Sequence, residues 1–181
     1  MALIYTAQLD PDKNEWIRLA LVGRGEPADV AFEKVGSYRF DDPEGEIGVE
    51  VMIVRVGERL VQIPFSYRSA EPAEGQVVTT AEHSVLGRRW IVDAATDPQA
   101  RDILRRGVAG ELPQAVLEMH DESGSYLETR QPDVTLTVVG EGSGGELDLT
   151  TELDPRATVD GVRALVADGR DFSALPVARL I

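Results

Sequence analysis

Apolar residues in the first part of the chain change their spacing after a short alternating stretch. From Ala2 to Leu9 apolar and polar residues alternate, which predicts a strand, because successive side chains of a strand point to opposite faces. Four further apolar residues recur at helical spacing, namely Trp16, Ile17, Ala20 and Leu21. Asp10 is a suitable N-cap with Pro11 at the first helical position, and Gly23 ends the pattern. We therefore expect a helix from about residue 10 to residue 22.

From Ser37 onward the pattern is typical of β-structure. Val49, Val51 and Ile53 alternate only partly with their neighbours, which predicts a strand covered on both faces. Gly57-Glu58 fits a tight two-residue turn, so Leu60 to Tyr67 is predicted as the returning strand of a hairpin. Pro64 within that run predicts an edge position or a bulge, because proline has no N–H to donate.

The rest of the chain predicts further strands and a second helix. Asp97-Pro98 repeats the helix start, and this helix should end near Gly107. The other elements that we expect are strands at 76–80 and 88–92, hairpins formed by 115–119 with 126–130 and by 134–139 with 147–153, a third helix at 159–167 and a last strand at 175–180. This balance predicts an α+β fold in which antiparallel strands dominate.

Three segments together resemble a known family. They are Tyr38 to Met52, Val61 to Arg68 and Glu82 to Asp93. In this order they are similar to the N-terminal cap domain of actinobacterial maltokinases, and more closely to stand-alone cap-like proteins that have no kinase body. The resemblance implies a curved antiparallel sheet packed on a long N-terminal helix, in a cystatin-like layout. It covers residues 1–97 and fades beyond them. We therefore divide the chain into a cap-like core at 1–110 and an extension of the same domain at 111–181.

Composition and charge limit the classes of partner. The chain has 181 residues with a formal net charge of -14, which disfavours nucleic acid and anionic membranes as partners. It has no cysteine, so disulfides and thiolate metal sites are excluded. Neither a signal peptide nor a membrane-spanning apolar run is visible, and the cytoplasm is the expected location.

The densest group of chemically distinctive side chains lies between Glu82 and Trp90. It holds one of the two histidines, two adjacent arginines and one of the two tryptophans. A histidine titrates near neutral pH, and an arginine fork can hold a carboxylate or a phosphate. The candidate binding residues are Tyr67, Arg68, His83, Arg88, Arg89 and Trp90. The alternative is structural: a histidine bonded within its turn, a buried Trp90 and an ion-paired Arg89.

Known catalytic patterns do not account for this group. Residues 140–145 match G-x-G-x-x-G, but a strand rather than a helix follows them and no lysine occurs after Lys34, so we interpret them as a hairpin turn. The sequence shows no Walker lysine motif and no kinase catalytic loop. Two histidines without cysteine do not supply the usual ligands of a zinc site. We therefore expect no catalytic residue, no metal and no cofactor.

The sequence leaves three kinds of function open. The first is a non-catalytic cap-like binding or regulatory protein. The resemblance suggests that its partner is a separately encoded kinase or another enzyme of maltose, trehalose or glycogen metabolism. The second is a protein that binds a small molecule or a carbohydrate. The third is an enzyme of unrecognised type. A concave pocket with converging polar groups would favour a small-molecule ligand, and a flat apolar patch would favour a protein partner.

Overall fold

The structure is a computed structural model that describes residues 2–45, 47–142 and 144–181. Glu46, in the first of the three segments that carry the family resemblance, and Ser143, in the glycine-rich loop, lie outside the described residues. The described residues form β1 (Ala2–Tyr5), β2 (Leu9–Asp10), α1 (Lys13–Gly23), β3 (Glu33–Asp41), β4 (Gly48–Val56), β5 (Arg59–Arg68), β6 (Val77–His83), β7 (Gly87–Asp93), α2 (Pro98–Ala109), β8 (Leu117–His120), β9 (Tyr126–Arg130), β10 (Thr135–Val139), β11 (Leu147–Leu149), β12 (Glu152–Leu153), β13 (Ala164–Gly169) and β14 (Phe172–Leu180).

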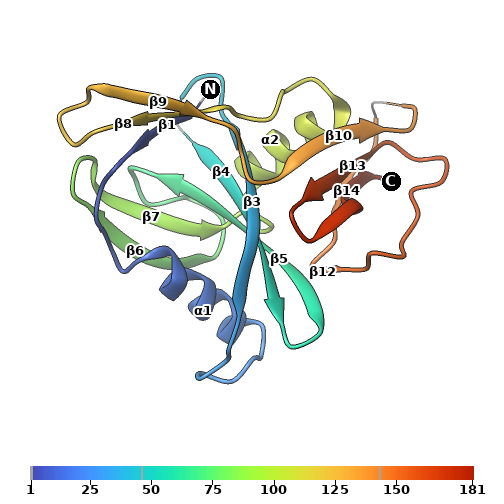
Figure 1. The fold of residues 1–181 in the computed structure, drawn as a ribbon, viewed down its shortest axis with the longest axis horizontal. Helices are drawn as coiled ribbons and strands as arrows, with labels where there is room; N and C mark the ends of the chain where they lie inside the picture. The colour runs from blue at the N-terminus through green and yellow to red at the C-terminus, as the bar shows by residue number, and fades with distance from the viewer. Residues whose placement is uncertain (1, 46, 143) are drawn as a thin grey trace.

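The largest sheet is antiparallel and has the order β2-β6-β7-β5-β4-β3, with β12 also paired to β5. The β4–β5 hairpin turns at Gly57, as the sequence predicts, with Val56 opposite Arg59. Gly57 has a φ of 58°, a conformation that favours glycine and is needed for this tight turn. Figure 1 shows β3, β4 and β5 crossing the middle of the molecule between α1 and the C-terminal strands.

The central strand β4 is buried on both faces, which confirms the prediction from its incomplete alternation. Met52 and Val54 belong to a buried cluster with Trp16 and Ile17 of α1. Val51, on the opposite face, belongs to a second cluster that is completed by residues of α2 and of the C-terminal strands. The sheet is therefore a middle layer, and we refer to its two sides as the α1 face and the α2 face.

The N-terminal helix differs in start and length from the expectation. Asp12, not Asp10, is the N-cap, and its Oδ1 accepts a hydrogen bond of 3.0 Å from the backbone N–H of Glu15. The helix α1 has 11 residues, one fewer than α2, so it is not a long helix. The structure does not confirm a cystatin-like layout, because the sheet is covered on its second face by α2 and further strands rather than wrapping one helix.

The second helix begins where the sequence places it. Asp97 is its N-cap, Pro98 occupies the first turn, and Gly110 ends it in the left-handed conformation with a φ of 80°. Asp97 is also bound from the sheet: Ser66 donates to its Oδ2 at 2.6 Å, and the Arg68 guanidinium pairs with the same oxygen. The helix start is thereby fixed to β5.

The C-terminal strands contradict two predictions. The strand β13 (Ala164–Gly169) replaces the second half of the third helix expected at 159–167, and it lies between β10 and β14 in a sheet of order β10-β13-β14-β11. Because β13 and β14 lie between β10 and β11 in this sheet, the hairpin expected from 134–139 and 147–153 does not form. Short apolar runs suit a helix or a strand equally, and pairing with distant strands decides between them. The β8–β9 hairpin is confirmed, and β1 adds to it in parallel, stopping at Tyr5.

Pro64 lies in an inner strand, which corrects the expected edge position. The backbone N–H of Gln62 points to the β12 side of β5, where it donates to Thr151 O. The nitrogen of Pro64, two residues on, faces the same side. There it falls between the end of β12, which pairs with Leu60 and Val61, and β7, whose pairing begins at Phe65. The proline is tolerated because neither neighbour needs a hydrogen bond at this point.

The two sides of residue 110 share one core. The larger buried cluster contains Val51 and Leu165, which lie on opposite sides of that residue. Gln62 is fully buried and connects the sheets directly: its Nε2 donates to Val177 O at 2.6 Å, and its Oε1 accepts from the Tyr38 hydroxyl at 3.0 Å. The division into 1–110 and 111–181 stays a prediction.

Candidate functional site

A cavity of about 520 Å³ lies on the α1 face of the large sheet. Its walls come from β1, the start of α1, strands β3, β4 and β5, and the turn between β6 and β7. This size is typical of a pocket for a small ligand. The polar residues that line it are Tyr5, Lys13, Arg39, Glu50, Tyr67, Arg68, His83 and Arg89. We call it the cationic pocket, since basic side chains outnumber acidic ones among these described residues.

Glu50 forms the floor of the cationic pocket. Although it is a charged residue, it is only 6% exposed, because it lies within the buried strand β4. Its Oε2 accepts two hydrogen bonds of 2.7 Å, one from Lys13 Nζ and one from the Tyr67 hydroxyl. Burial by itself raises the pKa of Glu50, but the charge and hydrogen bond of Lys13 and the hydrogen bond of Tyr67 lower it to about 2. The carboxylate is therefore ionised at neutral pH.

Tyr67 is surrounded by aromatic and basic groups. Its ring lies 5.6 Å from the Trp16 ring, and the Arg39 guanidinium lies 5.7 Å from its centroid. Burial and the neighbouring Glu50 raise the pKa of Tyr67 well above its usual value, so the hydroxyl keeps its proton and donates a hydrogen bond to Glu50. Tyr67 thus orients the carboxylate instead of acting as a base.

Arg39 packs across the glycine beside it. Its Nε donates to Asp41 Oδ1 at 2.6 Å, and its guanidinium crosses the backbone of Gly48 on the neighbouring strand. A Cβ at Gly48 would overlap that guanidinium. The glycine in the segment that carries the family resemblance therefore leaves room for a charged side chain in the pocket wall.

His83 and Arg89 form the opposite wall. The Nδ1 of His83 accepts backbone hydrogen bonds from Val85 at 3.2 Å and Leu86 at 3.1 Å, as expected for a histidine bonded within its turn. Partial burial and the charge of Arg89 lower the pKa of His83, which favours a neutral ring with its proton on Nε2. Arg89 donates to Leu86 O at 2.7 Å. Within the described part of the chain, no carboxylate lies within salt-bridge distance of Arg89.

Strand alternation divides the six residues that the sequence singles out. Tyr67, His83 and Arg89 share the α1 face and line the cationic pocket. The side chain of Arg68 points to the α2 face, where it pairs with Asp97 and donates to Gln99 Oε1 at 3.2 Å. Arg68 therefore contributes only to the edge of the cationic pocket. The remaining two residues, Arg88 and Trp90, lie on the α2 face of β7.

The positions of Arg88 and Trp90 correct part of the sequence interpretation. Arg88 is exposed and pairs with Glu82 at 3.0 Å, outside the pocket lining. Trp90 lies opposite Arg68 and is half-buried, so it is not the buried core residue that we expected. The helical pattern of apolar residues in α1 is buried as a group. Trp16, Ile17 and Leu21 are each at most 2% exposed, and Ala20 is partly buried against the same cluster.

Sequence reasoning missed three of the charged residues that line the pocket. Lys13, Arg39 and Glu50 belong to no recognisable chemical motif. One signal was present: Glu50 is a charged residue between Val49 and Val51, in a strand that the sequence predicts to be covered on both faces. A buried carboxylate is stable only when it is paired, so the position of Glu50 implies a basic side chain close to it.

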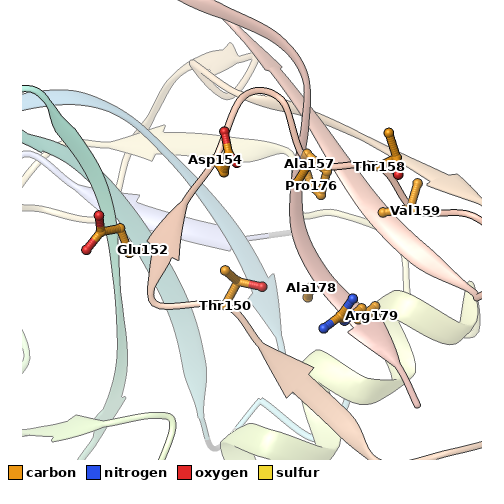
Figure 2. Close-up of a pocket in the computed structure, with 9 residues that line it drawn as sticks. All are labelled: Thr150, Glu152, Asp154, Ala157, Thr158, Val159, Pro176, Ala178 and Arg179. Atoms are coloured by element: carbon orange, nitrogen blue, oxygen red, sulfur yellow. The ribbon is translucent and has the colours of Figure 1, made fainter.

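A second cavity of about 150 Å³ lies beside β12 and β14. Figure 2 shows its lining, with Glu152 and Asp154 on the segment around β12 and Arg179 on β14. Glu152 lies 3.5 Å from Arg59, and Arg179 lies 2.7 Å from Asp148, so two of the charged residues are already paired. This cavity is smaller, and none of the six candidate residues lines it.

Within the described residues, no group of three or more acidic or histidine side chains is arranged to hold a metal ion. Neither helix in the described part of the chain has the length and apolar character needed to cross a bilayer.

Residues 8–97 match the family described as the maltokinase N-terminal cap domain. The match contains α1 and strands β2 to β7, and it ends at the N-cap of α2. No curated protein and no solved structure matches the chain.

Proposed function

Because residues 8–97 belong to the maltokinase N-terminal cap domain family, we propose that this chain is a non-catalytic, cytoplasmic cap-like protein that works by binding a small molecule in the cationic pocket. The family supports a role beside a kinase rather than as one. The pocket supports a ligand, since it is concave and several polar groups converge in it. This observation favours a small-molecule ligand, the second kind of function that the sequence leaves open.

The chemistry of the pocket supports binding without turnover. Tyr67 holds its proton and donates to Glu50, and His83 uses Nδ1 to accept hydrogen bonds from its own turn. Glu50 accepts from Lys13 as well, so its negative charge is already matched. A general base needs a free lone pair and a pKa near the working pH, and the pKa of Glu50, lowered to about 2, lies far below neutral pH. These three groups are better suited to fixing a ligand than to moving a proton.

A protein partner is the second part of the proposal. The family name supports a separately encoded kinase, or another enzyme of maltose, trehalose or glycogen metabolism. The edge strand β9 offers a surface for it: all of its residues are exposed, and Tyr126 and Leu127 are 57% and 52% exposed. Exposed apolar side chains on an unpaired edge are typical of a surface that adds another strand or a partner.

Filling the pocket tests the proposal. Ala7 lines the cationic pocket, and the adjacent Thr6 is exposed and does not. Ala7→Trp should therefore occupy the pocket, while Thr6→Trp adds the same side chain outside it. Each protein is incubated with a small-molecule extract, washed and denatured, and the released compounds are identified by mass spectrometry. We expect a compound retained by the wild type and by Thr6→Trp and lost from Ala7→Trp. Equal retention by all three proteins would contradict a ligand site in this pocket.

A further inference from the structure

We propose that the cationic pocket is specific for a small hydroxylated organic anion, with a carboxylate or phosphate group beside Arg89 and a hydroxyl group beside Glu50. This inference rests on the proposed function, because it assumes that the cationic pocket is the ligand site. It adds the chemical class of the ligand. A neutral sugar and an anionic one are separate outcomes of the test below.

The charges on the α1 face favour an anion. Lys13 is balanced by Glu50 at 2.7 Å, and Arg39 is balanced by Asp41 at 2.6 Å. Arg89 adds a further positive charge, and among the described residues it has no acidic partner. Arg68, at the edge of the pocket, is balanced by Asp97. The basic side chains of the pocket wall and their acidic partners thus sum to one net positive charge, in a chain whose formal net charge is -14. A concave site concentrates such a field, which attracts an anion despite the acidity of the whole chain.

Two buried donors in the pocket wall lack an acceptor. Trp16 Nε1 and Arg89 Nε are both buried, and neither has a hydrogen-bond partner among the described residues. Trp16 and Arg89 both line the cationic pocket. A buried donor without a partner is unfavourable, and an indole or guanidinium N–H can only donate. The matching group on a ligand is therefore an acceptor, and an oxyanion supplies several acceptor oxygens at once.

Glu50 adds the requirement for a donor on the ligand. Both hydrogen bonds that it accepts from side chains end on Oε2, from Lys13 and from Tyr67. Within the described residues, Oε1 is left without a side-chain donor. An ionised carboxylate oxygen accepts only, so the ligand group that meets it must donate, as a hydroxyl does. The tyrosine ring of Tyr5, which lies 6.1 Å from the His83 ring, offers an apolar wall for the body of the ligand.

Three compounds with one ring and different charge at carbon 6 test this assignment. They are D-glucose, D-glucuronate and D-glucose 6-phosphate, which are neutral, carboxylate-bearing and phosphate-bearing. The reporter is the indole N–H signal of Trp16 in a nuclear magnetic resonance spectrum of the full chain. The variant Trp90→Phe assigns this signal, because it removes the other of the two tryptophans. We expect glucuronate, glucose 6-phosphate or both to shift this signal with a Kd at least about tenfold lower than that of glucose, because hydrogen bonds to charged groups are the stronger ones.

Adjacent arginines provide the matched variants. Arg89 lines the pocket, whereas Arg88 lies on the other face of the same strand and pairs with Glu82. Arg89→Gln should weaken binding of the anionic probe about tenfold or more, and Arg88→Gln should change it less than about twofold. A thermal melt shows whether each variant folds. If Arg89→Gln does not fold, titration of the wild type at low and high sodium chloride decides instead, since an ionic contact weakens as salt is added.

The outcomes separate the two proposals. Loss of anion binding in Arg89→Gln alone, or its weakening by salt, supports the inference. Binding of glucose as tightly as the anions, or equal effects of the two arginine variants, overturns it and leaves the pocket as a ligand site for neutral compounds. A Trp16 signal that none of the three compounds shifts also overturns it. The proposed function is then judged separately, by whether Ala7→Trp loses a retained compound.

Discussion

Replacing Glu50 by glutamine keeps the shape of the side chain and removes its negative charge. In the folded protein the pKa of Glu50 is lowered from 4.5 to about 2, since Lys13 and Tyr67 outweigh the effect of burial. Each pH unit of difference corresponds to about 1.4 kcal/mol, so the ionised carboxylate contributes at most about 3 kcal/mol to folding at neutral pH. Lys13 is 39% exposed, and solvent weakens its attraction. We therefore expect Glu50→Gln to lower the free energy of unfolding by about 2–3 kcal/mol at pH 7.

The pH dependence of this difference identifies its cause. Because the pKa of Glu50 is lower in the folded state, its contribution is complete above the unfolded pKa near 4.5 and is lost as the pH falls towards 2. The difference between wild type and Glu50→Gln should shrink to about 1 kcal/mol at pH 3. Urea denaturation of both proteins at pH 7, 4 and 3 measures this change, because the two lower values lie between the unfolded and the folded pKa of Glu50.

An exposed glutamate serves as the control. Glu58 lies in the β4–β5 turn and is exposed, so Glu58→Gln should leave the free energy of unfolding within about 0.5 kcal/mol at every pH. A difference between wild type and Glu50→Gln that stays constant from pH 7 to pH 3 would refute the electrostatic explanation. It would instead show that the amide disturbs packing. Unchanged stability at pH 7 would show that the contacts with Lys13 and Tyr67 contribute little.

Three further predictions concern the core, a close backbone contact and activity. Trp16→Ala should lower the free energy of unfolding by roughly 3–5 kcal/mol, because the ring is buried against Phe65 and Tyr67; near-wild-type urea denaturation would show that α1 does not anchor the sheet. Gly107→Ala should destabilise by about 1–3 kcal/mol, since its Cβ would lie 2.6 Å from Phe40 Cζ, whereas Gly23→Ala, with open space around it, should be neutral or stabilising in the same thermal melts. The purified chain should neither hydrolyse ATP nor transfer its phosphate, as measured by ADP release; steady turnover that follows the protein through purification would contradict a non-catalytic role.

Local signals in the sequence were sufficient where the structure is decided by neighbours in the chain. The Gly57-Glu58 turn fixes the β4–β5 hairpin, since only glycine readily adopts its positive φ. Asp97 and Pro98 define the start of α2 through a cap and a fixed φ that need no distant contact. The incomplete alternation around Val51 indicated a strand buried on both sides, because each face must meet apolar partners.

Only the tertiary structure decided the C-terminal sheet. The apolar residues Ala164 to Ala167 suit a helix as well as a strand, and they become β13 because β10 and β14 supply hydrogen bonds on both sides. β11 likewise pairs with β14, which is closer in space than β10 although not in sequence. Such pairings depend on residues far along the chain, which local periodicity does not report.

The candidate site shows the same division. Sequence proximity joined Arg88, Arg89 and Trp90 in one patch, but the alternation of a regular strand sends Arg89 to the α1 face and the other two to the α2 face. The residues that share the pocket with Arg89 come from elsewhere in the chain: Lys13 from α1 and Glu50 from β4 line it because the helix packs across the sheet. The sequence by itself determined which residues could carry charge and recognition. The packing of α1 against the large sheet decided which of them share one pocket.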